Sequence, residues 1–88
     1  MIYQKNMFVR FRIIDTKPYL ILNDNAFILD DVGVNIWESI DSKKNIEEII
    51  NKISNVYSVE SNKITKDIKN YLKDLEKNGL IEVCKEIS

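Results

Sequence analysis

The sequence predicts an α+β fold of the winged-helix-like kind, a three-stranded antiparallel meander followed by three α-helices. Short apolar segments occupy the first third of the chain, and from residue 32 onwards apolar residues recur at spacings of three and four. Turn-forming and helix-capping residues separate these segments. At 88 residues we expect one domain, 1–88, with a modest core, because a domain this small buries only about 60% of its unfolded surface.

The first predicted strand starts at Met7, and its side chains alternate between two faces. The two sets are Val9, Phe11 and Ile13 on one face, and Phe8, Arg10 and Arg12 on the other. The shared face of the arginines has two interpretations, contact with a partner enzyme or plain solubilising charge.

Two further strands are predicted at residues 19–22 and 26–29. Residues 15–18, Asp-Thr-Lys-Pro, predict the turn before the first of them, and residues 23–25, Asn-Asp-Asn, predict a tight hairpin before the second. Connections this short permit only an antiparallel meander, since parallel strands need a long crossover. The strand at 26–29 therefore lies at an edge of the sheet.

Three helices follow, each with its own start signal or stop signal. Asp30 or Asp31 caps the first, which ends near Asp41. Asn45 and Glu48 resemble a capping box at the start of the second. The third runs over about 62–78 and stops at Gly79.

Each helix is expected to bury an apolar face against the sheet or its neighbours. Trp37 is assigned to the core between the first helix and the sheet. The other core-facing residues of the second and third helices are Ile46, Ile49, Ile50, Ile53, Tyr57, Ile64, Ile68, Tyr71, Leu72 and Leu75. A short apolar tail, Leu80, Ile81 and Val83, is expected to pack back onto this core.

The composition excludes most catalytic chemistry. With no histidine and one cysteine, the chain has no His-based triad and no His/Cys metal site. Gly33 and Gly79 are the only glycines, so Gly-rich phosphate loops are excluded too. Adjacent acids such as Asp30 and Asp31 are read as helix caps. We therefore expect no cofactor and no enzymatic activity.

The charge balance points away from polyanionic partners. Thirteen basic and fourteen acidic side chains leave a net charge of −1, too little to attract nucleic acid or an anionic membrane. The single Cys84 suits a reducing compartment, and no signal peptide or membrane span is evident. A cytoplasmic location is expected.

Two segments carry a family resemblance: ILDDVGVNIWESIDSKKNIEEII at 28–50 and DIKNYLKDLEKNGLI at 67–81. Their pattern resembles the PqqD-like family of precursor-peptide recognition elements, which serve the biosynthesis of ribosomally made, modified peptides (RiPPs). The shared positions are Leu29, Asp30, Gly33, Ile36, Trp37, Asp41, Ile46, Glu48, Ile49, Asp67, Ile68, Tyr71, Leu72, Leu75, Gly79 and Leu80. One departure is Ser42, where the family often carries glycine after the aspartate.

The resemblance implies a domain that binds the leader of a precursor peptide and presents it to a separate modifying enzyme, such as a radical-SAM maturase, a leader peptidase or a cyclase. The strand at 26–29 fits this expectation, since it is uncharged and carries neither lysine nor proline. An extended peptide can add to such an edge as a fourth strand, with main-chain bonds supplying affinity and pockets supplying selectivity.

The resemblance further implies that the peptide lies between the third strand and the third helix. The candidate residues are Ala26, Phe27, Ile28, Leu29, Lys63, Ile64, Asp67, Ile68 and Tyr71. Which strand residues face the helices stays open, as does the choice for Tyr71 between core and groove border. Lys63 and Asp67 are either charge selectors for the leader or ordinary surface charges, and an exposed ion pair is worth only about 0–1 kcal/mol.

Two alternatives compete with peptide binding. A winged-helix nucleic-acid-binding regulator would use the lysines of the third helix, Lys63, Lys66, Lys69, Lys73 and Lys77. These lysines are interleaved with acids, and we expect them to spread around the polar side without forming one basic stripe. The other alternative is an interaction or dimerisation module with no peptide client. The charge pattern favours the peptide binder.

Overall fold

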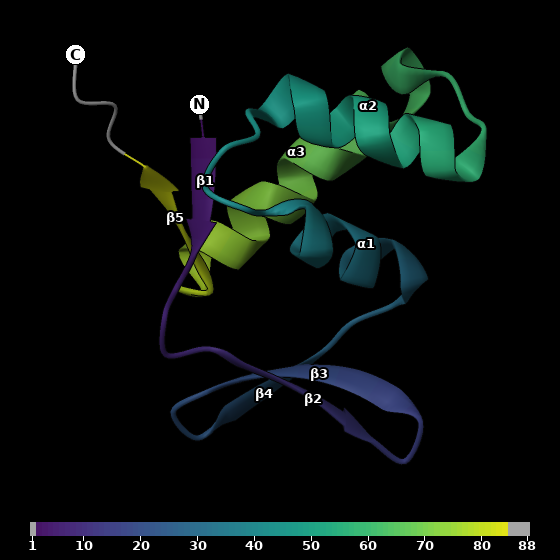
Figure 1. Cartoon of the computed structure of the whole chain (residues 1–88). Coiled ribbons are helices and arrows are strands. Elements are labelled where there is room, and N and C mark those ends of the chain that lie inside the picture. Colours follow the sequence, from purple (N-terminus) through teal and green to yellow (C-terminus); the bar gives the residue numbers. More distant parts are fainter. Residues whose placement is uncertain (1, 85–88) are drawn as a thin grey trace.

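The computed structural model describes residues 2–84, and over this range it is an α+β fold, as predicted. A layer of three helices lies above a three-stranded sheet, with a two-stranded sheet at one side (Figure 1). The helices are α1 (Asp31–Ser39), α2 (Ile46–Tyr57) and α3 (Ser61–Lys77). The strands are β1 (Ile2–Lys5), β2 (Arg10–Ile14), β3 (Lys17–Leu22), β4 (Asn25–Ile28) and β5 (Ile81–Cys84).

The predicted meander is present as the antiparallel sheet β2-β3-β4. Its first strand starts at Arg10 and not at Met7, and its first turn is only Asp15-Thr16, with φ of 51° and 66°. Lys17 and Pro18, predicted as turn residues, begin β3 instead. A two-residue turn with positive φ at both positions matches the right-handed twist of the strands, so pairing continues up to it.

The sheet formed by β1 and β5 was not predicted. Lys5 pairs with Ile81 and Ile2 pairs with Cys84 in an antiparallel register. The expected apolar tail does pack back on the core, since Leu80 and Ile81 are each 1% exposed, but it does so as a strand. Each partner is four residues long, and nothing local in either segment signals the other.

The helix ends confirm the capping predictions. The Asp30 carboxylate accepts from the amide of Gly33 at 2.7 Å, and α1 starts at the next residue. The capping box of α2 is complete, with the Glu48 amide donating to Asn45 Oδ1 at 2.9 Å and the Asn45 amide donating to the Glu48 carboxylate at 3.3 Å. Gly79, with φ of 77°, follows the end of α3.

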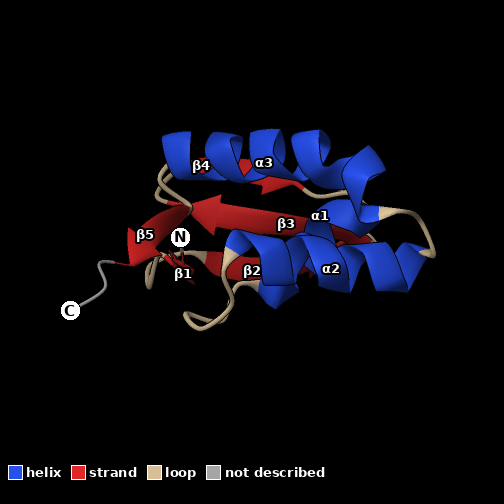
Figure 2. Ribbon diagram, turned by 90° about the horizontal axis from the view of Figure 1, so that it is seen from above, coloured by secondary structure: helices blue, strands red, loops and turns tan. Residues whose placement is uncertain are grey.

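The helices hold the sheet through one apolar core. Leu20 of β3, Ile49 of α2 and Leu72 of α3 are completely buried. Trp37 is 5% exposed, which confirms its assignment to the core, and the Lys5 ammonium lies 5.0 Å from the centroid of its ring. Seen from above, α3 lies on the β4 side of the sheet and α2 on the β2 side (Figure 2). Within residues 2–84, no helix is long and apolar enough to cross a bilayer.

Candidate functional site

The open edge of β4 is the first component of the site. β4 pairs with β3 on one side, and no other strand in the described range pairs with it. The amide of Leu29 donates to the carbonyl of Pro18 at 3.0 Å, so Leu29 and, two residues earlier, Phe27 turn their backbone groups toward β3. Backbone direction alternates along a strand, so Ala26 and Ile28 present their N–H and C=O groups to the open edge.

The side chains of the same segment alternate between two environments. Phe27 is half-buried and Leu29 is 5% exposed, so this pair faces the helices. Ala26 is exposed and Ile28 is 59% exposed on the opposite face. The tertiary packing therefore shows which pair faces the helices, a choice that the sequence left open.

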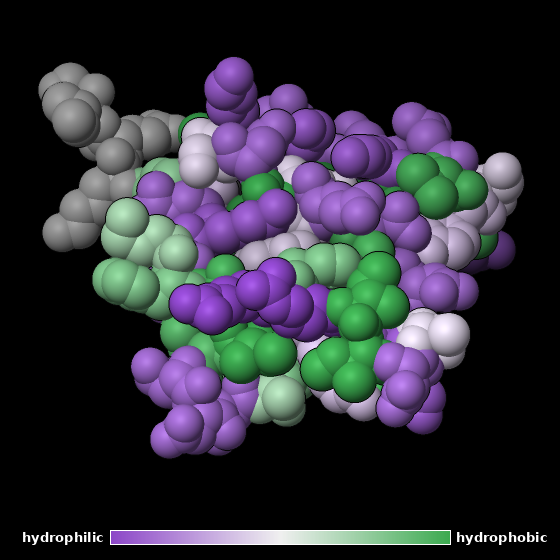
Figure 3. Space-filling view, turned by 60° about the horizontal axis from the view of Figure 1, so that its bottom comes forward, coloured by the Kyte–Doolittle hydropathy of each residue, from purple (hydrophilic) through white to green (hydrophobic). Residues whose placement is uncertain are grey.

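The outer face of the sheet combines apolar and cationic side chains. Figure 3 views the molecule from below, where apolar groups flank a strongly hydrophilic band. The large apolar side chains that are exposed on or near this face are Met7, Phe8, Ile14 and Ile28, whereas the exposed Ile13 lies on the same face of β2 as Phe11. Arg10 and Arg12 are exposed on β2 and form no ion pair within residues 2–84. Their contact with a partner enzyme stays a prediction.

Tyr71 of α3 forms the wall beside the end of β4. A cavity of about 290 Å³ is lined by Ile28, Leu29, Asp30 and Tyr71. The ring is half-buried, and burial, followed by the negative charge of Asp30, raises the pKa of the Tyr71 hydroxyl. The hydroxyl therefore stays neutral and able to donate at physiological pH.

Gly33 permits this wall to form, although it is not among the site residues predicted from the sequence. A Cβ at Gly33 would lie 2.2 Å from the Tyr71 hydroxyl oxygen and 3.0 Å from an Asp30 carboxylate oxygen. Such distances are far below van der Waals contact, so only glycine lets α1 and α3 approach this closely. A glycine inside the first turn of a predicted helix was the available signal.

A second, mostly apolar cavity of about 240 Å³ lies between the three helices. Its lining residues are Val32, Ile36, Ile53, Tyr57, Val59, Ile64, Asp67 and Ile68. Ile68 is only 2% exposed and belongs to the core, Ile64 is half-buried, and Asp67 is exposed. Val32 and Val59 are 38% and 39% exposed, so this cavity opens at the surface near the N-terminal half of α3.

Of the nine predicted site residues, six line one of two cavities and three line neither. Ile28, Leu29 and Tyr71 share one cavity, and Ile64, Asp67 and Ile68 share the next. Ala26 and Phe27 lie on β4 itself, whereas Lys63 is exposed and lines neither cavity. No group of histidine, cysteine, aspartate or glutamate in the described part of the chain could hold a metal ion.

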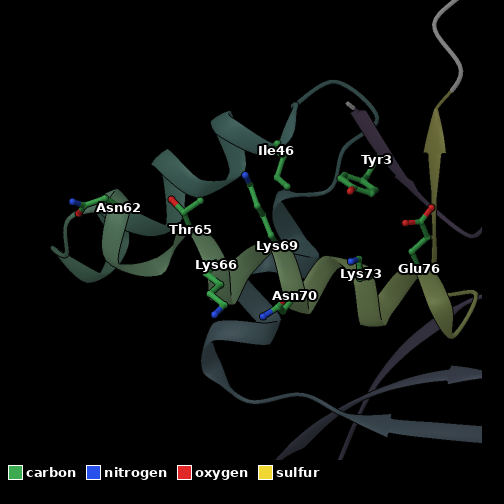
Figure 4. Close-up of a pocket in the computed structure, with 9 residues that line it drawn as sticks. All are labelled: Tyr3, Ile46, Asn62, Thr65, Lys66, Lys69, Asn70, Lys73 and Glu76. Atoms are coloured by element: carbon green, nitrogen blue, oxygen red, sulfur yellow. The ribbon is translucent and has the colours of Figure 1, made fainter.

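The lysines of α3 are less scattered than predicted. Three of them, Lys66, Lys69 and Lys73, line a single cavity of about 680 Å³ on another side of the helix (Figure 4). The expectation that these lysines form no common stripe is therefore wrong for these three residues. Lys63 and Lys77 do not line this cavity.

A helical layer over a three-stranded sheet whose β4 edge is open and uncharged defines the class to which this protein belongs, a small α+β domain of the winged-helix-like kind. Residues 19–81 match the family described as Coenzyme PQQ synthesis protein D (PqqD). The chain belongs to the PqqD family. No curated protein matches the chain at a significant level.

Two solved structures have a similar fold. TbiB1 in complex with the TbiA(beta) leader peptide is 28% identical, with a TM-score of 0.78 over 94% of this chain and 99% of that one. The PqqD truncation of Methylobacterium extorquens PqqCD is described as a functional and stand-alone RiPP recognition element. It is 23% identical, with a TM-score of 0.77 over 93% of this chain and 89% of that one, a likeness of fold.

Proposed function

We propose that this protein binds the leader region of a ribosomally synthesised precursor peptide and presents it to a separate modifying enzyme, without performing the chemistry itself. Membership of the PqqD family and the likeness to TbiB1, a protein solved with a leader peptide, support this proposal. The observation that carries it is the open edge of β4, where Ala26 and Ile28 offer unpaired backbone groups beside the wall formed by Tyr71.

The leader adds to this edge as a fourth strand of the sheet β2-β3-β4. Ala26 and Ile28 each contribute one donor and one acceptor, and each hydrogen bond is worth about 0.5–1.5 kcal/mol net. Because side chains alternate along an added strand, every second leader residue points toward α3. These residues enter the cavity beside Tyr71 and, further along, the apolar cavity at Ile64.

Apolar pockets supply most of the selectivity in this arrangement. Full burial of a leucine-sized side chain is worth about 1.5–3 kcal/mol. Lys63 and Asp67 are both exposed, so a charge on the leader facing either of them adds only about 0–1 kcal/mol. Charge therefore adjusts the choice of leader, while apolar burial drives binding.

Substitution of Ile28 tests the strand addition. Ile28→Pro removes an outward amide from β4, whereas Ile28→Ala keeps the amide and removes only the side chain. The proposal expects a precursor peptide to be encoded near this gene, and its leader is the labelled ligand. We expect the proline variant to lose about tenfold or more in affinity for this leader, which is about 1.4 kcal/mol, measured by fluorescence anisotropy. The alanine variant loses less.

Ile13→Pro is the matched control at the other edge. Pro18 directs its carbonyl toward Leu29 on β4, so its register partner Ile13 directs its backbone groups away from β3 to the open edge of β2. Ile13 is 68% exposed, as suits an edge position. Strand addition at β4 requires that Ile13→Pro leaves the affinity unchanged. Equal losses in the two proline variants, or no loss in either, refute the assignment of the edge.

The helix wall has its own test. Tyr71→Ala empties one side of the cavity beside Leu29, whereas Tyr71→Phe keeps the ring and removes the hydroxyl. We expect a large loss of leader affinity for Ala and a smaller one for Phe, with the fold checked by circular dichroism. If both variants bind as the parent does, the leader does not use this wall.

A further inference from the structure

The cavity lined by lysines on α3 is separate from the proposed leader groove. Lys73 follows Tyr71 by two residues, which places it about 200° around the helix axis. In Figure 4 the cavity lies along α3, with Ile46 and Tyr3 on its far side. A ligand in this cavity and a leader on β4 therefore occupy different sides of the same helix.

Polar residues occupy successive positions along this face of α3, although their side chains spread apart from it (Figure 4). Asn62, Lys66, Lys69, Lys73 and Glu76 follow one another at spacings of four, three, four and three residues. This repeat keeps side chains on one face of a helix. The row extends about 21 Å, fourteen residues at 1.5 Å each.

Lysines outnumber acids along this row, and none of the three lysines forms an ion pair within residues 2–84. The one ion pair in the described part of the chain joins Lys44 to Asp41, far from these lysines in sequence. Lys66, Lys69 and Lys73 are all exposed, and Glu76 is the only acid that lines the cavity. Three ammonium groups against one carboxylate leave a local excess of positive charge on a chain whose total charge is −1.

The floor of the cavity is apolar and belongs to the packed core. Ile46 is half-buried and Tyr3 is 5% exposed. An adjoining cavity of about 360 Å³ shares Ile46, Thr65 and Lys69, and adds the buried Ile50 and one acid, Glu47. Asn62, Thr65 and Asn70 add hydrogen-bonding groups at the rim.

We propose that this cavity is a docking site for an acidic segment of another protein, whose carboxylates pair with Lys66, Lys69 and Lys73 while its apolar side chains cover Ile46. An apolar floor with a cationic and amide rim is the composition of a protein interface. Nucleic acid fits less well, because a phosphate backbone requires a broader basic surface and would meet Glu76. We identify the docked protein as the modifying enzyme, and this identification rests on the proposed function. The cavity and its charge are features of the structure and do not depend on that function.

Two triple variants of the full chain test the docking site. The variant Lys66→Glu/Lys69→Glu/Lys73→Glu reverses the charge of the three lysines that line the cavity. Lys17→Glu/Lys43→Glu/Lys52→Glu makes the same change of net charge at three other exposed lysines. Each is titrated with the modifying enzyme that the proposed function expects to be encoded near the precursor gene and, separately, with the leader peptide. A triple Lys→Gln variant of the cavity replaces the Glu variant if that one does not fold.

We expect the cavity variant to lose about tenfold or more in affinity for the enzyme, with a weaker dependence on salt than the parent. The control variant changes by about twofold or less, and both variants bind the leader as the parent does. No loss in the cavity variant, equal loss in both, or no binding of the enzyme to the parent overturns the proposal.

Three further outcomes are informative. If the parent fails to bind the leader but binds the enzyme through these lysines, the docking site stands and the proposed leader function fails. Duplex DNA of random sequence is titrated at the same salt concentration. If the parent binds this DNA and only the cavity variant loses that binding, while enzyme binding is unchanged, the ligand of the cavity is nucleic acid and not an acidic protein segment. Loss of enzyme binding in an Arg10→Glu/Arg12→Glu variant alone moves the docking site to the outer face of the sheet.

Discussion

At the scale of single residues, the contact between Gly33 and Tyr71 does most to shape the proposed site. The absence of a side chain at Gly33 lets the Tyr71 hydroxyl approach the first turn of α1, beside Asp30. The same tyrosine lines the cavity at the end of β4. One glycine therefore positions the wall against which a leader would pack.

Gly33→Ala is predicted to destabilise the protein. In an ordinary helix this change adds about 0.5–1 kcal/mol of stability. Here the new Cβ lies 2.2 Å from the Tyr71 oxygen, so the ring must move, and overpacking of this kind costs about 1–3 kcal/mol. Urea unfolding measures the net change in the free energy of unfolding.

The double variant Gly33→Ala/Tyr71→Phe is the control for this prediction. Removal of the hydroxyl leaves the nearest ring carbon 3.1 Å from the new Cβ, a tight contact that a small shift relieves. We expect the double variant to recover part of the loss, which is a favourable coupling between the two sites. A single Gly33→Ala variant as stable as the parent would contradict the close approach.

At the scale of elements, the hairpin of β2 and β3 is built on a turn that its sequence does not favour. Thr16 adopts φ of 66°, although a β-branched residue pays a steric cost in the left-handed region. The two strands nevertheless pair from Arg10 to Ile14. The energy of packing Phe11 and Leu20 against the helices therefore outweighs the local strain.

Thr16→Gly is predicted to stabilise the protein by about 1 kcal/mol. Relief of the left-handed strain is worth about 1–2 kcal/mol, and the added freedom of glycine in the unfolded chain takes back about 0.5–1 kcal/mol. Thermal unfolding followed by circular dichroism measures the change. Lys17→Gly, one residue later in a strand, is the control and should give no gain.

The helices and their ends were the features of this fold that the sequence predicted best. The caps at Asp30 and Asn45 and the stop at Gly79 act within four residues of themselves, so local patterns predicted them correctly. The predicted ends of β2 and β3 were less accurate. Thr16 tolerates a tighter turn than its residue type suggests, because pairing of the flanking strands compensates for the strain.

At the scale of the whole molecule, two tyrosines, one buried and one half-buried, join distant parts of the chain. Tyr3 of β1 is buried beside β5, and Tyr71 of α3 lies beside the end of β4. Burial raises the pKa of both hydroxyls, aided by Glu76 at Tyr3 and by Asp30 at Tyr71. The folded protein therefore holds these two protons more strongly than the unfolded chain does.

Stability is predicted to fall with pH above about 10. Below the unfolded pKa of a tyrosine, about 10, the hydroxyls are protonated in both the folded and the unfolded state. In that range they do not make the free energy of unfolding depend on pH. Above it the unfolded chain binds fewer protons than the folded one, so the free energy of unfolding decreases as pH rises. Urea unfolding between pH 7 and pH 11 should show a shallower fall for Tyr3→Phe/Tyr71→Phe than for the parent. Identical curves would contradict the raised pKa values.

By itself, the sequence of this protein determined the order of the three-stranded meander and the three helices, its helix caps, the lack of histidine and an uncharged segment at 26–29. Each of these depends on residue type or on spacings of a few residues. Only the tertiary structure decided that β1 pairs with β5, that Ala26 and Ile28 face the open edge, and that three lysines share one cavity. These features join residues up to about eighty positions apart, and packing of the whole core selects such contacts where local periodicity cannot.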